Sequence, residues 1–229
     1  MVDLTTEMAQ LWGSLGAPTP GRGRTVMFVA AHDGEGTSTV AREFARIAVG
    51  RAEKPVWLVD LNLDGAGQAE AIAEQAAQYG AIGRPAAATP DGSVFFTVQP
   101  TGRDRTGQPV ADARYITAQP VGGRKLWVTR FRREALARTQ RIHLLPKPDY
   151  WRALRRHADM VVIDAPAFSR SEACLTIAPF ADVIILVVAA EGDDTAGPAE
   201  LRDALNAVGG RTAGIVFNRA RLGRLTPAY

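Results

Sequence analysis

A glycine-rich segment between an apolar run and an amphipathic stretch is the first part of the chain that could perform chemistry. It reads Asp33-Gly34-Glu35-Gly36-Thr37-Ser38-Thr39 and follows the apolar residues 26–30. Glycines let a backbone wrap closely around phosphate oxygens, and the amides of residues 34–39 would point into that cradle where the next helix starts. Ser38 stands where such loops place a Mg²⁺-binding hydroxyl, whereas Thr37 replaces their lysine. Alone, the segment fits either a phosphate loop or an ordinary strand–turn–helix with a capping serine.

Two aspartates extend this possibility, because each directly follows an apolar run. Asp60 comes after residues 56–59 and Asp164 after residues 160–163. The carboxyl ends of parallel strands share the edge of a sheet where ligands bind, and carboxylates there can hold the waters of a Mg²⁺ ion. One such aspartate is often only a helix cap. Together with the loop, the pair predicts a present or ancestral nucleotide site, with Ser38, Asp60 and Asp164 holding Mg²⁺ and the two aspartates catalytic if the protein is active.

The elements that must position these residues follow from the apolar pattern. Apolar strands without alternation, separated by helices, predict an α/β fold with a mostly parallel central sheet and helices on both faces. The expected strands cover 26–30, 56–60, 160–164, 183–188 and 213–217. The expected helices cover 3–15, 38–49, 66–79, 149–157, 171–178 and 199–208.

The chain shows no convincing linker, so residues 1–229 are interpreted as one domain. Residues 1–23 form an N-terminal helix and a connector, and residues 80–124 form an irregular elaboration of the core. Within the elaboration we expect strands at 94–98 and 115–118, and a hairpin turn at 121–124 that leads into 125–131. A chain of 229 residues that is 46% hydrophobic can bury the core of one such domain.

Composition excludes several classes of protein. The net charge of +3 is a weak argument for nucleic-acid binding, and the single Cys174 excludes a disulfide framework within the chain. The start of the sequence lacks the basic and apolar regions of a signal peptide. The longest apolar run, 183–190, is far shorter than the roughly 20 residues that span a bilayer. We therefore expect a cytoplasmic protein without a transmembrane segment, whose membrane contact is indirect or peripheral.

Four motifs resemble the cytoplasmic ATPase domain of bacterial tyrosine kinases and their relatives in exopolysaccharide and capsule biosynthesis. These proteins belong with the partitioning and septum-site ATPases of deviant P-loop type. The family pattern Pro-Gly-Glu-Gly-Lys-Ser-Thr corresponds to residues 33–39, and Asp-x-Asp-x-Arg corresponds to residues 60–64. The pattern Asp-x-Pro-Pro corresponds to Asp164-Ala165-Pro166-Ala167, and Gly-x-Val-x-Asn to residues 214–218. The resemblance extends from about residue 4 to residue 220.

This resemblance implies the three-layer αβα fold of P-loop NTPases and a site for ATP or ADP with Mg²⁺. It assigns nucleotide contacts to Gly34, Glu35, Gly36, Thr37, Ser38 and Thr39, and it places Asn218 near the adenine. It also implies a membrane protein of polysaccharide chain-length control or export as the partner. That partner would bring the protein to the inner face of the inner membrane. Homo-oligomers fit this reading, and direct nucleic-acid binding is not expected.

The departures from the family pattern fall mostly on charged positions. Thr37 replaces the P-loop lysine, and His32 stands where partitioning ATPases carry a second lysine. Asn62 replaces the second aspartate of its motif, and Asp64 replaces the arginine that follows. The kinases' assembly motif Glu-x-x-Arg-x-x-Arg and their C-terminal tyrosine cluster correspond here to Glu7, Gln10 and Gly13, and to the single Tyr229.

Three functional hypotheses follow from these observations. The first is a pseudo-kinase or pseudo-ATPase with a degenerate ATP site and weak or no catalysis, which regulates polysaccharide synthesis or export. The second is an active ATPase or protein-tyrosine kinase of the same pathway, against which Thr37, Asn62 and the single Tyr229 argue. The third is a partitioning or positioning protein, against which the missing signature lysine and the low net charge argue. The first is favoured.

Two further features concern arginine, which accounts for most of the 27 basic residues. Arg42 lies one helical turn after Ser38 and could replace the missing lysine, but we expect it to face solvent. Residues 130–156 carry nine basic and two acidic residues, a net charge of +7. That stretch fits a solvated face, or a contact with anionic lipid, an acidic partner or a neighbouring subunit.

Overall fold

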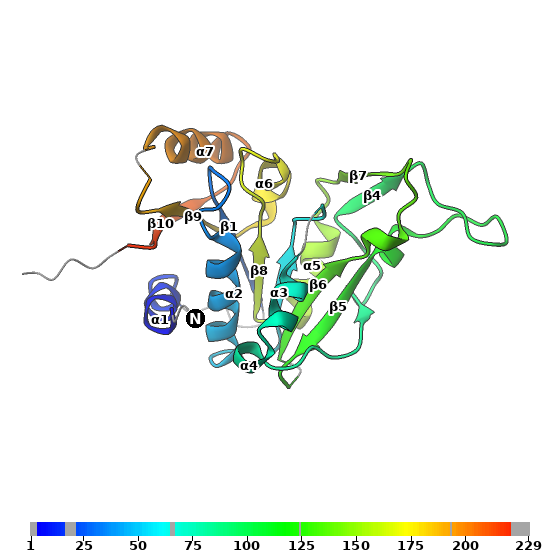
Figure 1. Ribbon diagram of the computed structural model, residues 1–229, viewed down its shortest axis with the longest axis horizontal. Coiled ribbons are helices and arrows are strands. Elements are labelled where there is room, and N and C mark those ends of the chain that lie inside the picture. The colour runs from blue at the N-terminus through cyan, green and yellow to red at the C-terminus, as the bar shows by residue number, and fades with distance from the viewer. Residues whose placement is uncertain (1–3, 17–21, 65–66, 124, 193, 221–229) are drawn as a thin grey trace, which may run out of the picture.

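The computed structural model describes residues 4–16, 22–64, 67–123, 125–192 and 194–220. Its centre is an eight-stranded sheet in the order β10-β9-β1-β8-β2-β6-β5-β3, which runs from left to right in Figure 1. The first six strands in that order are parallel to their neighbours, and β5 and β3 are antiparallel additions at one edge. The predicted mostly parallel sheet is confirmed. The strands of this sheet are β1 (Arg24–Val29), β2 (Val56–Asp60), β3 (Ala86–Ala87), β5 (Ile116–Val121), β6 (Leu126–Phe131), β8 (Met160–Asp164), β9 (Val183–Ala189) and β10 (Thr212–Asn218).

Helices cover both faces of the sheet, as predicted. Successive strand residues point to opposite sides, so an apolar strand presents apolar side chains that need covering on both faces. Val26 and Phe28 of β1 pack in a cluster with residues of the helices on one face, whereas Met27 and Val29 pack with those on the other. The first group of helices is α1 (Thr5–Ser14), α2 (Thr37–Val49), α3 (Gln68–Glu74) and α4 (Ala76–Tyr79). The second group is α5 (Asp149–His157), α6 (Ala173–Ile177) and α7 (Ala196–Ala207). The arrangement has three layers, αβα.

The stretch predicted as one helix over 66–79 is two helices, and that part of the prediction is wrong. The chain leaves helical geometry at Gln75, whose φ of −114° and ψ of 37° separate α3 from α4. The break turns Tyr79 inward, where its ring is buried. An alanine-rich pattern predicts helix but carries no signal for such a kink, because the kink depends on what Tyr79 contacts.

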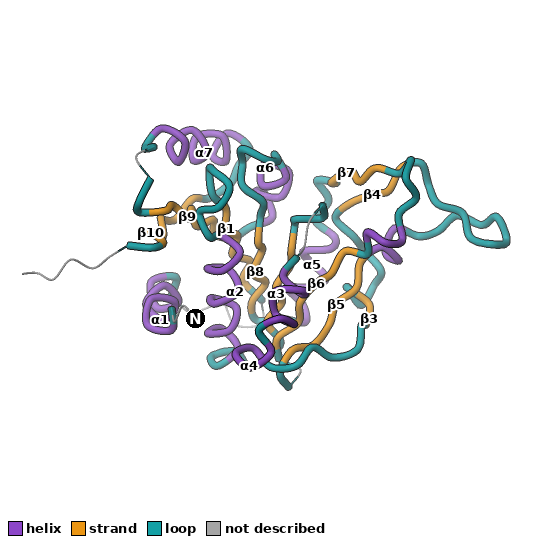
Figure 2. Tube along the Cα trace, viewed as in Figure 1, coloured by secondary structure: helices purple, strands orange, loops and turns teal. Residues whose placement is uncertain are grey.

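The segment 80–124 supplies strands to two sheets. β5 and β6 form the predicted hairpin, with Gly122 and Gly123 at positive φ in its turn, while Arg124 lies outside the described residues. β6 pairs in parallel with β2, so this hairpin continues the central sheet. β4 (Phe96–Gln99) pairs with β7 (Arg141–Leu144), a strand that the sequence did not predict. Figure 2 shows that the connection between β4 and β5 is mostly loop.

Three short 3₁₀ turns complete the elements, at Asp112–Tyr115, Arg133–Ala135 and Ala178–Phe180. Among the described residues, no helix is long and apolar enough to cross a membrane. The register places Asp60 of β2 directly beside Asp164 of β8, and Phe28 of β1 on the other side of Asp164. The carboxyl ends of these three central strands therefore meet at one edge, where the loop that follows β1 also begins.

We predict that Phe44→Ala strongly destabilises the fold. Phe44 of α2 is fully buried, and its ring centroid lies 5.2 Å from that of Phe28 and 6.0 Å from that of Trp12. Truncating a buried phenylalanine costs about 3–5 kcal/mol of unfolding free energy. Urea denaturation followed by circular dichroism would measure the loss. Val208→Ala, at a position that is 39% exposed, is the control and should change the free energy by less than about 0.5 kcal/mol.

Candidate functional site

The predicted phosphate loop connects β1 to α2 in a conformation that depends on glycine. Gly34 and Gly36 have φ values of 82° and 90°, which side chains rarely allow. A Cβ atom on Gly36 would also collide with the side-chain nitrogen of Asn218. That nitrogen donates a hydrogen bond of 2.8 Å to the carbonyl oxygen of Glu35. Asn218, at the end of β10, therefore supports the loop directly, and its predicted place near an adenine stays a prediction.

The side chain of Glu35 holds the loop in place from within. Its two carboxylate oxygens accept hydrogen bonds from the backbone nitrogens of His32, at 2.8 Å, and Ala189, at 3.1 Å. Glu35 is buried, so these bonds compensate for the loss of water around its charge. The second bond links the loop to the end of β9. Because both carboxylate oxygens accept hydrogen bonds from the backbone, Glu35 acts as a positioning group for the loop.

The loop forms one wall of a cavity of about 210 Å³. The opposite wall comes from the segment after β8. Several predicted site residues thus share one cavity, whereas Asp60 and Asn218 lie outside its lining. The lining consists of residues 32–39, Asn62, 164–167 and Arg170. Arg170 is the only arginine or lysine in that lining, and its guanidinium lies 3.4 Å from the Asp33 carboxylate at the rim.

Asp60 is buried and bound to the backbone of the loop that follows it. Its oxygens accept hydrogen bonds from the backbone nitrogens of Asn62, at 2.8 Å, and Gln68, at 2.7 Å. Burial and the neighbouring charge of Asp164 raise the pKa of Asp60 to about 7, although these two hydrogen bonds act in the opposite direction. Asp60 thus holds the backbone in place at Asn62 and at Gln68.

Asp164 is less exposed than Asp60, and only one of its two carboxylate oxygens has a hydrogen-bond partner among the described residues. Its Oδ2 accepts a 2.6 Å hydrogen bond from the Gln68 side chain, while its buried Oδ1 has no hydrogen-bond partner among the described residues. Burial raises the pKa of Asp164 to about 6, and the hydrogen bond from Gln68, the nearby Ser38 hydroxyl and the charge of Arg42 limit the rise. A buried oxygen without a partner, beside the hydroxyl of Ser38, suits a cation with oxygen ligands such as Mg²⁺.

Gln68 and Arg42 are the site residues that sequence reasoning missed or misplaced. The Gln68 amide nitrogen donates to Asp164 and, at 2.8 Å, to the carbonyl oxygen of Ser38. Its amide oxygen accepts a 2.9 Å bond from Arg42, which also donates to the Tyr79 hydroxyl at 3.2 Å. Arg42 is only 7% exposed, so the prediction that it faces solvent is wrong. Its spacing of four residues from Ser38 was the available signal, since such residues share one helix face.

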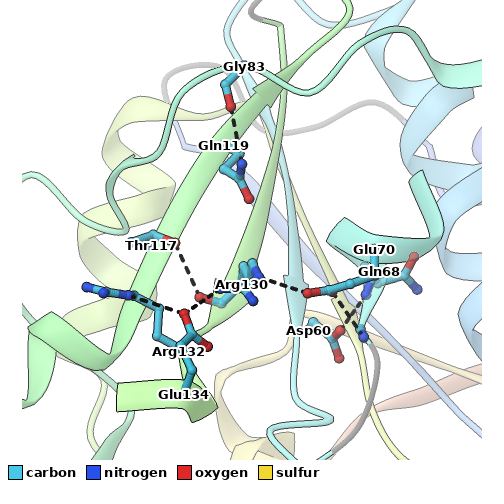
Figure 3. A network of polar contacts seen from close by, with 10 residues as sticks. Asp60, Gln68, Glu70, Gly83, Thr117, Gln119, Arg130, Arg132 and Glu134 are labelled. Carbon is cyan, nitrogen blue, oxygen red and sulfur yellow. Dashed lines mark hydrogen bonds and ion pairs between the residues drawn. The ribbon is translucent and has the colours of Figure 1, made fainter. Parts of the chain in front are cut away.

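A chain of ion pairs leads from this site toward β6, as Figure 3 shows. Glu70 accepts a hydrogen bond from the backbone nitrogen of Gly67 and pairs with Arg130 at 2.8 Å. Arg130 also pairs with Glu134 at 3.0 Å, and Arg132 lies 3.7 Å from the same carboxylate. The arginines at the start of the basic stretch therefore belong to a network of paired charges. This stretch is not one uniformly solvated face.

Comparisons with known proteins place the fold. No protein-family model matches the chain, and no curated protein sequence matches it. Among solved structures, the kinase domain of VpsO aligns with a TM-score of 0.56 and 16% identity over 95% of both chains. The kinase domain of the Escherichia coli tyrosine kinase ETK aligns with a TM-score of 0.57 and 13% identity, over 96% of this chain and 75% of that chain.

A nucleotide-binding protein from Archaeoglobus fulgidus, solved in complex with ADP, aligns with a TM-score of 0.53 and 16% identity. The alignment covers 86% of this chain and 67% of that chain. The protein therefore has the fold of bacterial tyrosine kinase domains and of related nucleotide-binding proteins. The resemblance inferred from the four motifs is confirmed at the level of the fold.

We predict that Asp164→Asn weakens the dependence of stability on pH. A carboxyl group with a raised pKa keeps its proton in the folded state after the unfolded chain has lost it. Its contribution to stability is therefore full below about pH 4 and is lost as pH rises toward 6 for Asp164 and 7 for Asp60. Urea unfolding at pH 5 and pH 7.5, with EDTA present, would measure the difference.

The free energy of unfolding of the wild type should lose more between these two pH values than that of Asp164→Asn. Asp203→Asn, an exposed change in α7 where the carboxylate pairs with Arg202, is the control and should behave as the wild type. Equal losses in the wild type and Asp164→Asn would contradict the burial of an ionisable Asp164.

Proposed function

We propose that this protein binds the phosphates of ADP or ATP and regulates exopolysaccharide or capsule synthesis or export with weak or no phosphoryl transfer. The observation that carries the proposal is the combination of a glycine-dependent cradle with a neutral Thr37. The cradle opens at the N-terminus of α2, a helix of 13 residues, where backbone amides and the helix dipole favour anions. These features support binding without the side chain that phosphoryl transfer needs most.

Ser38 and Asp164 are the residues that would hold a Mg²⁺ ion with the nucleotide. The unpartnered Oδ1 of Asp164 supports this assignment, since it is a buried acceptor at the cavity wall. A bound Mg²⁺ would neutralise charge on the phosphate oxygens. The prediction that Asp60 also faces the metal would require its two backbone hydrogen bonds to be exchanged. We therefore assign Asp60 the role of ordering the loop that carries Asn62 and Gln68.

Weak catalysis follows from charge. Phosphoryl transfer is catalysed mainly by positioning and by stabilising the charge on the transferred group. Thr37 supplies no positive charge, and Asn62 is a neutral residue that cannot act as a general base. Losing contacts of this kind typically costs about 100-fold or more in rate, or about 3 kcal/mol. The buried Arg42 donates hydrogen bonds to Gln68 and Tyr79 and is not among the residues that line the cavity.

The cellular role rests on the motif resemblance and on the fold shared with the tyrosine kinase domains of VpsO and ETK. We propose that the chain forms a single domain and acts through a membrane protein of polysaccharide chain-length control or export. Such a partner would place it at the inner face of the inner membrane. Formation of homo-oligomers is part of the same proposal.

The central prediction concerns Gly36 and Thr37. The wild type should bind ATP and ADP in the presence of Mg²⁺, and Gly36→Ala should abolish that binding because the added Cβ meets Asn218. Gly107→Ala is the matched control: Gly107 also has a positive φ, of 81°, but open space around it and no place in this cavity. Isothermal titration calorimetry would measure all three affinities.

Thr37→Lys should tighten ATP binding about tenfold or more, since a charged hydrogen bond is worth about 1.5–3 kcal/mol. Steady-state phosphate release should stay low in the wild type. Fast, saturable hydrolysis by the wild type that Asp164→Ala abolishes would overturn the proposal of weak catalysis. Absence of ATP and ADP binding in the wild type would overturn the proposed nucleotide site itself.

Arg170 should contribute to the affinity for nucleotide, because it is the only arginine or lysine in the cavity lining. We expect Arg170→Ala to weaken ADP binding several-fold, with a stronger effect at low salt, where an exposed charge is less screened. Arg202→Ala in α7 removes an equally exposed arginine outside the cavity and should leave the affinity unchanged. Fluorescence titration with a labelled ADP at two salt concentrations would test both variants.

A further inference from the structure

A second and larger cavity, of about 730 Å³, shares no residue with the first. It is formed by the connection between β4 and β5, which projects at the right of Figure 1, together with the segment that follows β6. Four arginines are part of its lining: Arg103, Arg105, Arg114 and Arg132. They come from three separate parts of the chain, so tertiary structure alone brings them together.

The projecting segment is an ordered hairpin. Asp104 accepts hydrogen bonds through one oxygen from the backbone nitrogens of Thr106 and Gln108 and from the Thr106 hydroxyl. The Arg103 guanidinium group donates a 2.7 Å hydrogen bond to the carbonyl oxygen of Gly107. The backbone nitrogen of Val110 donates a 2.8 Å hydrogen bond to the carbonyl oxygen of Gly102. These contacts close the tip of the hairpin and fix the guanidinium group of Arg103 on it.

The base of the cavity is built from buried polar groups. Gln140 donates to the carbonyl oxygen of Pro100 at 2.8 Å and to the Tyr115 hydroxyl at 3.3 Å. Tyr115 is 4% exposed and Gln140 7% exposed. A Cβ on Gly102 would come within 2.6 Å of the Tyr115 hydroxyl, so a glycine is needed where the hairpin leaves this base. The hairpin is thus fixed to the body of the protein.

The lining has a strong excess of positive charge: four arginines against the single Asp104. Hydrogen bonds from the Thr106 side chain and the backbone of the turn hold the pKa of Asp104 below its usual value, so the carboxylate is committed to the hairpin. Glu134, just outside the lining, is bound by Arg130 at 3.0 Å and lies 3.7 Å from Arg132. A concave surface of one charge sign concentrates ions of the other sign.

We propose that this cavity binds a small polyanion that carries at least two oxyanion groups, phosphate or carboxylate. Planar guanidinium groups bind such groups with paired hydrogen bonds. The volume lies in the range of about 300–1,000 Å³ that small-molecule sites occupy. The apolar side chains of the lining are Val110, Ala135 and Ala137, beside the buried ring of Tyr115. A polar, multiply charged ligand such as an oligophosphate or an acidic oligosaccharide therefore fits better than a nucleoside base.

The experiment uses Gly36→Ala as the parent protein, so that a phosphate-containing probe cannot report on the first cavity. Tripolyphosphate and trigalacturonate are titrated separately by calorimetry at low and high salt. The parent should bind at least one probe, less tightly at high salt. Arg105→Ala combined with Arg114→Ala should weaken binding about tenfold or more. Among the described residues, neither of these two guanidinium groups donates a hydrogen bond to the turn, although the charge of Arg114 helps to lower the pKa of Asp104.

Two further double variants control the result. Arg202→Ala with Arg211→Ala removes the same charge at exposed positions of α7 and the segment before β10, and should leave the affinity unchanged. Arg105→Lys with Arg114→Lys keeps the charge but loses the planar groups, and should give an intermediate affinity. Near-ultraviolet circular dichroism checks that each variant is folded.

The identity of the bound probe separates the two ligand sources. Binding of tripolyphosphate alone indicates a phosphorylated ligand, and binding of trigalacturonate indicates an acidic sugar. Failure of the parent to bind either probe would overturn the proposal. Equal weakening by the alanine pair in the cavity and by the distant arginine pair would also overturn it, because binding would then reflect overall charge.

Discussion

The site depends on one constraint: the negative charges of two buried carboxylates at neighbouring strand ends must be compensated. Asp60 and Asp164 are paired in register, and both are buried. Two carboxylates buried away from water are costly unless they are protonated, hydrogen-bonded or opposed by a cation. Gln68, 2% exposed, meets this need by donating its backbone nitrogen to one carboxylate and its side-chain nitrogen to the other.

The same amide connects the sheet to the phosphate loop. Its side chain also bonds the carbonyl oxygen of Ser38, so the start of α2 is held against β2 and β8 through one residue. Arg42 then adds a buried positive charge behind this bridge. Arg42 is not among the residues that line the cavity, whereas Arg170 is. The proposed phosphate ligand would meet backbone amides and Arg170 in the cavity lining.

The two cavities are built in different ways. Backbone geometry and buried acids form the small cavity at the phosphate loop, which has little positive charge of its own. A hairpin closed by Asp104 supports the larger cavity, whose lining is dominated by arginine. Between them runs the series of ion pairs from Glu70 through Arg130 to Glu134 and Arg132.

The sequence by itself determined the parallel strands of the central sheet, most of the helices, the position of the glycine loop, and the two aspartates at strand ends. These follow from patterns over a few consecutive residues, which local physics governs. Only the tertiary structure decided the burial of Arg42, the role of Gln68, the pairing of β4 with β7 and the gathering of four arginines. Each of those depends on contacts between residues far apart in the chain, such as Gln68 and Asp164, 96 positions apart. No local pattern records which distant partner a polar side chain will find, and that partner decides whether the side chain is buried or exposed.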